Sequence, residues 1–239
     1  MTDIKQKLIK WAEEYNDSSF IVNDPIQFPC SYKGSKRDME ISGFVTSWIS
    51  FGNRNAILDK ANDIDYKIFH RKPYDYIMSR EWEQYEHDSR KIYRFSSYDD
   101  FYHLCQKLYE LYQQHDSMEE IFVGREKRPI KVLNDYFGMV NGVPMNDISA
   151  CKKLCMFLRW MVRRDGIVDL GIWKSIDPRD LIMPIDTHVH SMALKLGITK
   201  RTLVNMKTAS EITDYMKTIF PTDPCLGDFA LFGYGINHK

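Results

Sequence analysis

Apolar residues recur along this chain at intervals of three and four positions, which places them on one face of an α-helix. Ile41, Phe44, Val45, Trp48 and Ile49 form one complete stripe of this kind. Further stripes lie within residues 4–15, 101–111, 154–162, 189–196 and 212–219. No run of residues alternates as a half-buried strand does. The spacing predicts an all-α fold, a single multi-helix domain over residues 1–239 with a cleft between two helical lobes.

Capping residues indicate where several of these helices begin and end. Asp38 is expected to cap the helix around residues 41–49, and Asp99 or Asp100 the helix around residues 101–111. Gly197 is expected at the position just after a helix, where a left-handed conformation favours glycine.

The two ends of the chain also give predictions. A last helix is expected to start with Asp223 as its cap and Pro224 as its first residue. The amphipathic N-terminal segment is expected to pack with the C-terminal helices. The polar and aromatic region 70–98 predicts a short helix followed by a connection.

Composition indicates how large a core the chain can form and which kinds of partner and compartment it favours. Hydrophobic residues make up 44% of the 239 residues, which is enough for a sizeable core. The 33 basic and 33 acidic residues cancel, which argues against binding nucleic acid through bulk charge but allows a local basic patch. An odd number of cysteines (5) without a CxxC pair predicts a reduced, cytoplasmic protein. We expect no signal peptide and no membrane association, and we expect a monomer.

The segment Asp186-Thr187-His188-Val189-His190 concentrates chemistry-bearing residues. Asp-x-His-x-His resembles the opening metal motif of amidohydrolases, which would make Asp186, His188 and His190 ligands. That fold needs many strand–helix units downstream, and too few residues follow Asp186. On a helix the two histidines would also point about 200° apart. A plainer interpretation is that Asp186 caps a helix and the histidines are ordinary. We expect no metal.

The same segment resembles the catalytic segment of the helix-hairpin-helix DNA glycosylase superfamily, the endonuclease III-like and archaeal 8-oxoguanine enzymes. The similarity extends to residues 195–197, 229–235, 43–53 and 24–26. The whole pattern also resembles an uncharacterised bacterial family of conserved hypothetical proteins. The resemblance implies that Asp186 is a catalytic carboxylate at a helix start.

Bifunctional members of that superfamily also use a lysine as nucleophile. In the endonuclease III branch the nucleophilic lysine would lie near residues 166–168, and this chain has no lysine there. In the archaeal branch it begins an apolar helix, which resembles Lys153, 33 positions before Asp186. A helical wheel places Lys153 at the edge of the buried face and Lys152 on the solvent face, so Lys152 is the fallback. Alternatively, both are solvated lysines at a helix start.

The resemblance also implies DNA-contacting residues. The hairpin that grips the backbone would correspond to residues 146–151, which lack the expected glycines but retain the small Ser149. Phe51 and Asn53 would fill the gap left in the duplex, and Trp160 or Trp173 would stack on the flipped base. The wheel places Arg159 and Arg163 on the solvent face, and a local basic surface is expected from Lys152, Arg159, Arg163 and Arg164.

Only Cys225 follows Asp186, so we expect no iron–sulfur cluster and no other cofactor. The expected partner is double-stranded DNA with a damaged base, the lesion guessed to be an oxidised purine. The expected activity is that of a DNA base-excision glycosylase, with AP lyase activity if Lys153 forms a Schiff base. The alternative is a catalytically silent helical protein of the same fold that binds DNA or a protein partner.

Overall fold

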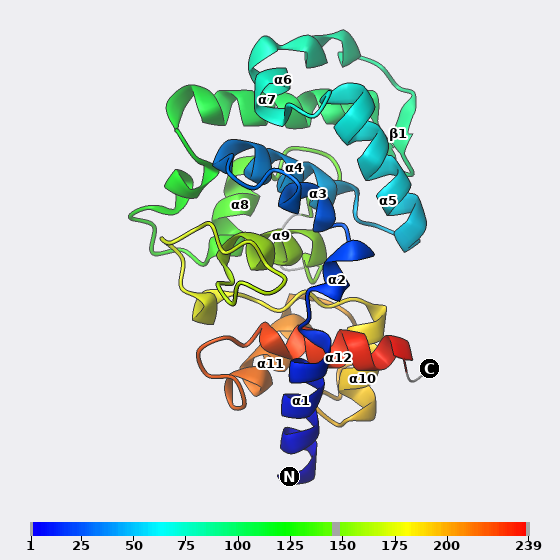
Figure 1. Ribbon diagram of the computed structural model, residues 1–239, viewed down its shortest axis with the longest axis vertical. Coiled ribbons are helices and arrows are strands. Elements are labelled where there is room, and N and C mark those ends of the chain that lie inside the picture. The colour runs from blue at the N-terminus through cyan, green and yellow to red at the C-terminus, as the bar shows by residue number, and fades with distance from the viewer. Residues whose placement is uncertain (1, 145–148, 238–239) are drawn as a thin grey trace. The chain divides into compact units, whose positions relative to one another are not determined.

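The computed structural model describes residues 2–144 and 149–237, and helices dominate it (Figure 1). The all-α prediction is confirmed. The chain divides into two compact units. Unit 1 consists of residues 1–22, 128–131 and 145–239, and unit 2 of residues 23–127 and 132–144. Across the described residues, no helix combines the length and apolar character needed to cross a bilayer.

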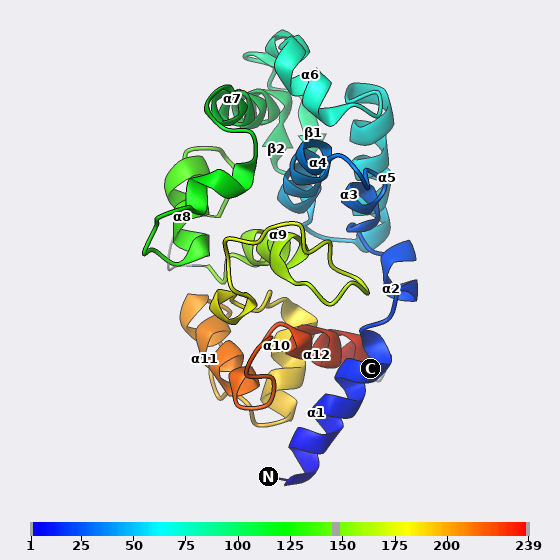
Figure 2. The ribbon, with the colours of Figure 1, turned by 60° about the vertical axis from the view of Figure 1, so that its left-hand side comes forward.

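Unit 1 contains both ends of the chain. Its elements are α1 (Thr2–Tyr15), α2 (Ser19–Val22), α9 (Lys152–Val162), the 3₁₀ turn η5 (Pro178–Asp180), α10 (Thr187–Lys195), α11 (Met206–Lys217) and α12 (Leu226–Asn237). Helix α12 packs against both α1 and α10, as two views show (Figures 1 and 2). The Trp11 and Tyr234 rings stack with centroids 3.9 Å apart. A Cβ atom at Gly233 would lie 2.3 Å from the Tyr15 ring, so glycine permits this close approach.

Unit 2 is built mainly around α4 and α7. Its elements are α3 (Gln27–Cys30), α4 (Lys36–Ile49), α5 (Arg54–Asp63), the π-helical turn η1 (Ile64–Ile68), α6 (Pro73–Ser79), the 3₁₀ turns η2 (Glu81–Tyr85) and η3 (Met118–Phe122), β1 (Lys91–Tyr93), β2 (Ser96–Ser97) and α7 (Tyr98–Gln114). Helix α8 (Pro129–Phe137) crosses the boundary between the units.

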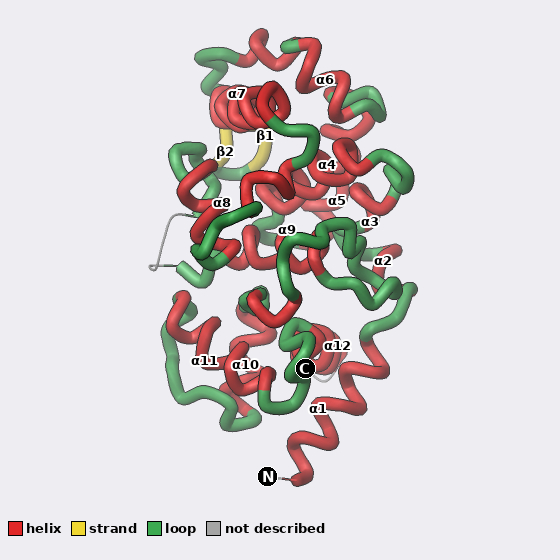
Figure 3. Tube along the Cα trace, turned by 90° about the vertical axis from the view of Figure 1, so that its left-hand side faces the viewer, coloured by secondary structure: helices red, strands yellow, loops and turns green. Residues whose placement is uncertain are grey.

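A small β-hairpin in unit 2 was not predicted from the sequence. Strand β1 pairs antiparallel with β2, and the two form the yellow segments of Figure 3. Strands of three and two residues are too short to show the alternation that identifies a strand in a sequence. Arg94 lies in the turn with a φ of 48°, a left-handed conformation uncommon for a residue other than glycine.

Two predicted helix caps are wrong by a few residues. Ser35, not Asp38, caps α4, and Ser97, not Asp99 or Asp100, caps α7. In α7 the Ser97 hydroxyl accepts a hydrogen bond from the Asp100 backbone N–H, and the Asp100 carboxylate accepts one from the Ser97 N–H. Each helix starts at the serine because its short side chain reaches the third helical N–H, and the aspartates then lie in the first turn.

In the C-terminal half, the predicted end of α10 is confirmed and the predicted start of α12 is wrong. Gly197 follows α10 with a φ of 68°, as predicted. Helix α12 begins at Leu226, later than the predicted cap Asp223. The Asp223 carboxylate instead accepts a hydrogen bond from Nε of Arg163, 2.7 Å away.

A buried carboxylate joins three elements of unit 2. Glu40 on α4 is fully buried, and it accepts hydrogen bonds from the Tyr112 hydroxyl (2.9 Å), the Ser117 hydroxyl (2.6 Å) and the Met118 N–H (3.0 Å). A buried carboxylate is tolerated only when such donors replace its water shell. Glu40 therefore fixes the end of α7 and the start of η3 against α4.

We predict that Glu40→Ala strongly destabilises the protein. The substitution leaves three buried donors without their acceptor, at a cost of on the order of 3 kcal/mol. Chemical denaturation followed by circular dichroism measures the loss, and Glu126→Ala at an exposed position serves as the control. Equal stability of the two variants would contradict the assigned role of Glu40.

Candidate functional site

Asp186 caps the N-terminus of α10, as predicted. Its Oδ1 atom accepts hydrogen bonds from the backbone N–H groups of His188 (2.9 Å) and Val189 (2.8 Å). The side chain remains partly exposed, and no described residue donates to its Oδ2 atom. The positive end of the helix dipole stabilises negative charge at this position. Asp186 is therefore a partly exposed carboxylate whose Oδ1 atom is fixed by the start of α10.

The negative charge of Asp186 also affects the pKa of a buried carboxyl group in unit 1. Burial raises the pKa of Asp228 on α12 to about 6; Arg159 opposes this shift, and the negative charge of Asp186 adds to it. The Asp228 carboxylate forms an ion pair with Arg159 on α9. Asp186 is thus electrostatically coupled to a buried ion pair that joins α9 and α12.

Lys153 lies in the first turn of α9. Its side chain is partly buried, and burial, followed by the positive charge of Lys152, lowers its pKa to about 8. Roughly half of such an amine is neutral at pH 8, whereas an ordinary lysine is almost entirely protonated there. The helical wheel placed Lys153 at the edge of the buried face, and both Lys152 and Lys153 are partly buried. A neutral amine is the form that can act as a nucleophile.

Arg159 and Arg163 were predicted on the solvent face, and this prediction is wrong. Their exposed fractions are 5% and 0%. Arg159 donates to Asp169 (3.2 Å) and pairs with Asp228. One turn later, Arg163 donates to Asp169 at 2.5 Å.

Two further carboxylates, which are less buried, complete this cluster. Arg163 donates to Asp165 (2.5 Å) and Asp223 (2.7 Å). The Phe229 ring lies near both guanidinium groups, with its centroid 4.7 Å from Arg159 and 4.8 Å from Arg163. The helical wheel failed here because the loop after α9 and helix α12 supply carboxylates that cover the arginine face. These two arginines are structural and do not contribute to a DNA-binding surface.

Arg164 and Ser149 make local contacts. The Arg164 guanidinium donates to the backbone carbonyls of Trp173 (3.1 Å), Lys174 (3.0 Å) and Ile176 (2.9 Å), so it holds the following loop. The Ser149 hydroxyl accepts a hydrogen bond from the Cys151 N–H at 3.1 Å. Residues 146–148 of the predicted hairpin lie outside the described residues.

Trp160 and Trp173 belong to the core of unit 1. Both have an exposed fraction of 0%, and Trp173 packs edge-on against Phe157 with ring centroids 5.3 Å apart. Neither ring presents a face on which a base could stack, which corrects the prediction. Apolar burial accounts for both positions.

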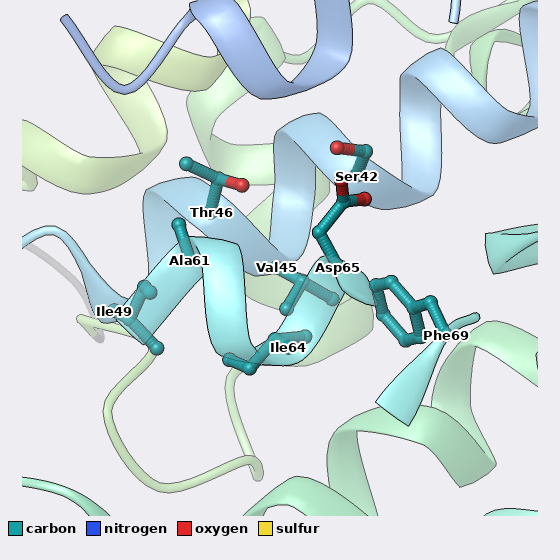
Figure 4. A pocket seen from close by; sticks show the side chains of 8 residues that line it. All are labelled: Ser42, Val45, Thr46, Ile49, Ala61, Ile64, Asp65 and Phe69. Atoms are coloured by element: carbon teal, nitrogen blue, oxygen red, sulfur yellow. The ribbon is translucent and has the colours of Figure 1, made fainter. Parts of the chain in front are cut away.

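A small pocket lies in unit 2, between α4 and the α5–η1 segment (Figure 4). Its lining consists of Ser42, Val45, Thr46, Ile49, Ala61, Ile64, Asp65 and Phe69. A cavity volume of about 10 Å³ is close to the minimum for a single water molecule. The pocket therefore cannot accept a nucleobase.

His188 and His190 do not form a metal centre with Asp186. His190 is buried, and its Nε2 atom lies 2.8 Å from the carbonyl oxygen of Arg201. Within residues 2–144 and 149–237, no three His, Cys, Asp or Glu side chains are grouped so as to hold a metal ion. This geometry favours the helix-cap interpretation of Asp186 over the metal-hydrolase alternative.

Phe51 and Asn53 lie in the α4–α5 loop of unit 2. Phe51 is 51% exposed, and its carbonyl accepts a hydrogen bond from the Tyr93 hydroxyl at 3.0 Å. The Asn53 side chain caps α5 by accepting from the Ala56 N–H at 3.3 Å. Both residues are accessible, as a DNA-contacting role requires.

We predict that Lys153 titrates as an abnormal lysine. After reductive methylation with ¹³C-formaldehyde, NMR of the folded protein should show one dimethyl-lysine signal that titrates near pH 8, because burial disfavours the ammonium. That signal should disappear in Lys153→Arg and persist in Lys152→Arg. Its persistence in Lys153→Arg would show that the assignment is wrong.

We predict that Arg163→Met destabilises the protein by about 3–5 kcal/mol, because it removes a fully buried guanidinium that pairs with the buried Asp169 carboxylate. Arg179, which forms an exposed pair with Asp177, provides the matched control. Arg179→Ala should leave the unfolding midpoint nearly unchanged. Thermal and urea unfolding measure both, and a small effect of Arg163→Met would contradict the structural role.

Comparison with known proteins gives a family and no activity. A family model described as a protein of unknown function (DUF2400) matches residues 24–237. Neither the curated proteins nor the solved structures contain a match to this chain. The matched range spans both compact units and includes Lys153 and Asp186. The chain therefore belongs to the DUF2400 family of proteins of unknown function.

Proposed function

We propose that this protein is a DNA glycosylase that removes a damaged base from double-stranded DNA, with AP lyase activity through a lysine Schiff base. The observation that carries the proposal is the fixed, partly exposed Asp186 carboxylate at the start of α10. It lies within the segment that resembles the catalytic segment of helix-hairpin-helix glycosylases. Lys153, with its lowered pKa, belongs to the same compact unit.

Lys153 is the nucleophile in this proposal. The lone pair of its neutral Nζ forms a bond to C1′ of the deoxyribose, and the glycosidic bond breaks. The departing base takes the bonding electrons and a proton. Loss of a proton from nitrogen and opening of the sugar then give an iminium ion between Nζ and C1′. This Schiff base permits elimination of the 3′ phosphate and hence strand cleavage.

Asp186 supplies negative charge at a defined position. Two backbone N–H groups hold its Oδ1 atom, so the helix start fixes the orientation of the carboxylate. Its Oδ2 atom can accept the proton that Lys153 loses, and its charge stabilises positive charge that develops on the sugar. Extrusion of the damaged nucleotide from the helix precedes this chemistry, because the target carbon is shielded in the duplex.

DNA contacts in this proposal come from a smaller set than the sequence predicted. Lys152 at the start of α9 remains partly exposed, and Phe51 and Asn53 are exposed in unit 2. Arg159 and Arg163 are excluded because they are buried in ion pairs. Few basic side chains are then involved, so we expect binding to depend only moderately on salt.

Borohydride trapping tests the proposed chemistry. Incubation with duplexes that carry an abasic site or an oxidised base, followed by reduction, should give a covalent protein–DNA adduct. The adduct should be lost in Lys153→Ala and retained in Lys152→Ala. Its rate of formation should rise with pH through about 8 and then level off, because the neutral amine is the reactive form.

A second readout separates base release from strand cleavage. Asp186→Asn should abolish release of the damaged base while Asp177→Asn, at an exposed ion pair, should not. Absence of both adduct and base release across a lesion panel, with folded protein, would reject the enzymatic proposal. The chain would then be a catalytically silent helical protein that binds DNA or a protein partner.

A further inference from the structure

Two loops of unit 2 form a small exposed structure that the sequence did not reveal. One is the α4–α5 loop, and the other is the turn between β1 and β2. We call their tip, formed by Phe51, Gly52, Tyr93, Arg94 and Phe95, the aromatic tip. It brings together residues that lie about forty positions apart in the sequence.

Specific contacts hold the aromatic tip in one arrangement. The Tyr93 hydroxyl donates to the Phe51 carbonyl (3.0 Å), and Nζ of Lys91 donates to the Phe95 carbonyl (3.0 Å). Gly52 has a φ of 100°, and a Cβ there would lie 2.5 Å from the Arg94 guanidinium carbon. The absence of a side chain at Gly52 therefore leaves the space that the Arg94 guanidinium occupies. The contacts pre-organise the tip, which lowers the entropy lost on binding.

The tip combines exposed aromatic surface with positive charge. Phe51 is 51% exposed and Phe95 is 73% exposed, with ring centroids 5.8 Å apart. The Arg94 guanidinium carbon lies 5.7 Å from the Phe51 ring centroid. Arg94 is exposed, and its guanidinium faces the Phe51 ring.

This chemistry matches one class of partner. Exposed phenyl rings offer stacking surfaces to bases of any sequence, and a neighbouring guanidinium attracts the phosphate backbone. The two rings lie on two loops that the Tyr93–Phe51 hydrogen bond holds together, which suits insertion where base stacking is already interrupted. A purely apolar protein partner would leave the charge of Arg94 uncompensated.

We propose that the aromatic tip binds DNA at an interrupted base stack, with Phe95 and Phe51 stacking on exposed bases and Arg94 contacting a phosphate. This inference rests on the proposed function, since it assumes that DNA is the partner. It extends the predicted role of Phe51 to the β-hairpin, with Phe95 as a second stacking residue.

Fluorescence anisotropy with a labelled duplex that contains a tetrahydrofuran abasic analogue tests the proposal. Phe95→Ala should weaken binding by about 5- to 150-fold, the effect of losing one base–aromatic stack. Arg94→Gln should weaken binding and reduce the slope of log affinity against log salt by about 0.9. Both side chains are exposed, so unchanged unfolding midpoints should show that the variants fold.

Tyr66→Ala provides a matched control. Tyr66 is an exposed aromatic residue of unit 2, 56% exposed, and the Arg71 guanidinium carbon lies 5.2 Å from its ring centroid. Its removal should leave DNA affinity unchanged. Unchanged affinity of Phe95→Ala, an equal loss in Tyr66→Ala, or absence of binding by the wild type would each overturn the proposal.

The two proposals fail separately. If the wild type forms a borohydride adduct while Phe95→Ala binds DNA normally, the tip proposal is wrong and the catalytic proposal stands. If neither an adduct nor base release is detected but Phe95→Ala loses affinity, the tip proposal stands and the catalytic proposal is wrong.

Discussion

The buried ion-pair cluster around Arg159 and Arg163 is the interaction on which the organisation of unit 1 depends. Two guanidinium groups on one face of α9 bind carboxylates from the following loop and from α12. Burying such charges costs several kcal/mol each, so the cluster persists only because each guanidinium has several partners. The cluster therefore fixes where α9 lies relative to α12, and α12 in turn packs against α10.

The candidate catalytic residues depend on this arrangement. Lys153 stands at the start of α9 and Asp186 at the start of α10, and the Asp228–Arg159 pair links the two helices through α12. Helix α12 also packs against α10, so buried contacts connect α9 with α10 through α12. Placing both candidate groups on helices held by buried contacts gives them the rigidity that catalysis or tight binding requires.

The basic residues of this chain, whose net charge is zero, differ in whether they are buried in ion pairs or exposed to solvent. Arg159 and Arg163 neutralise buried aspartates, whereas Arg94 and Lys152 remain accessible. A count of charges, or a helical wheel, cannot separate these groups because both treat every arginine as solvated.

Helical periodicity alone determined the all-α class, and the segment around Asp186 determined a capped helix start, because both follow from local spacing along the chain. Local patterns also placed Lys153 at the edge of an apolar helix. Only the tertiary structure decided that Arg159, Arg163, Trp160 and Trp173 are core residues, since carboxylates and apolar groups distant in sequence cover them. It alone brought Phe51 beside Phe95, because a hairpin too short to show a pattern in the sequence carries the second ring.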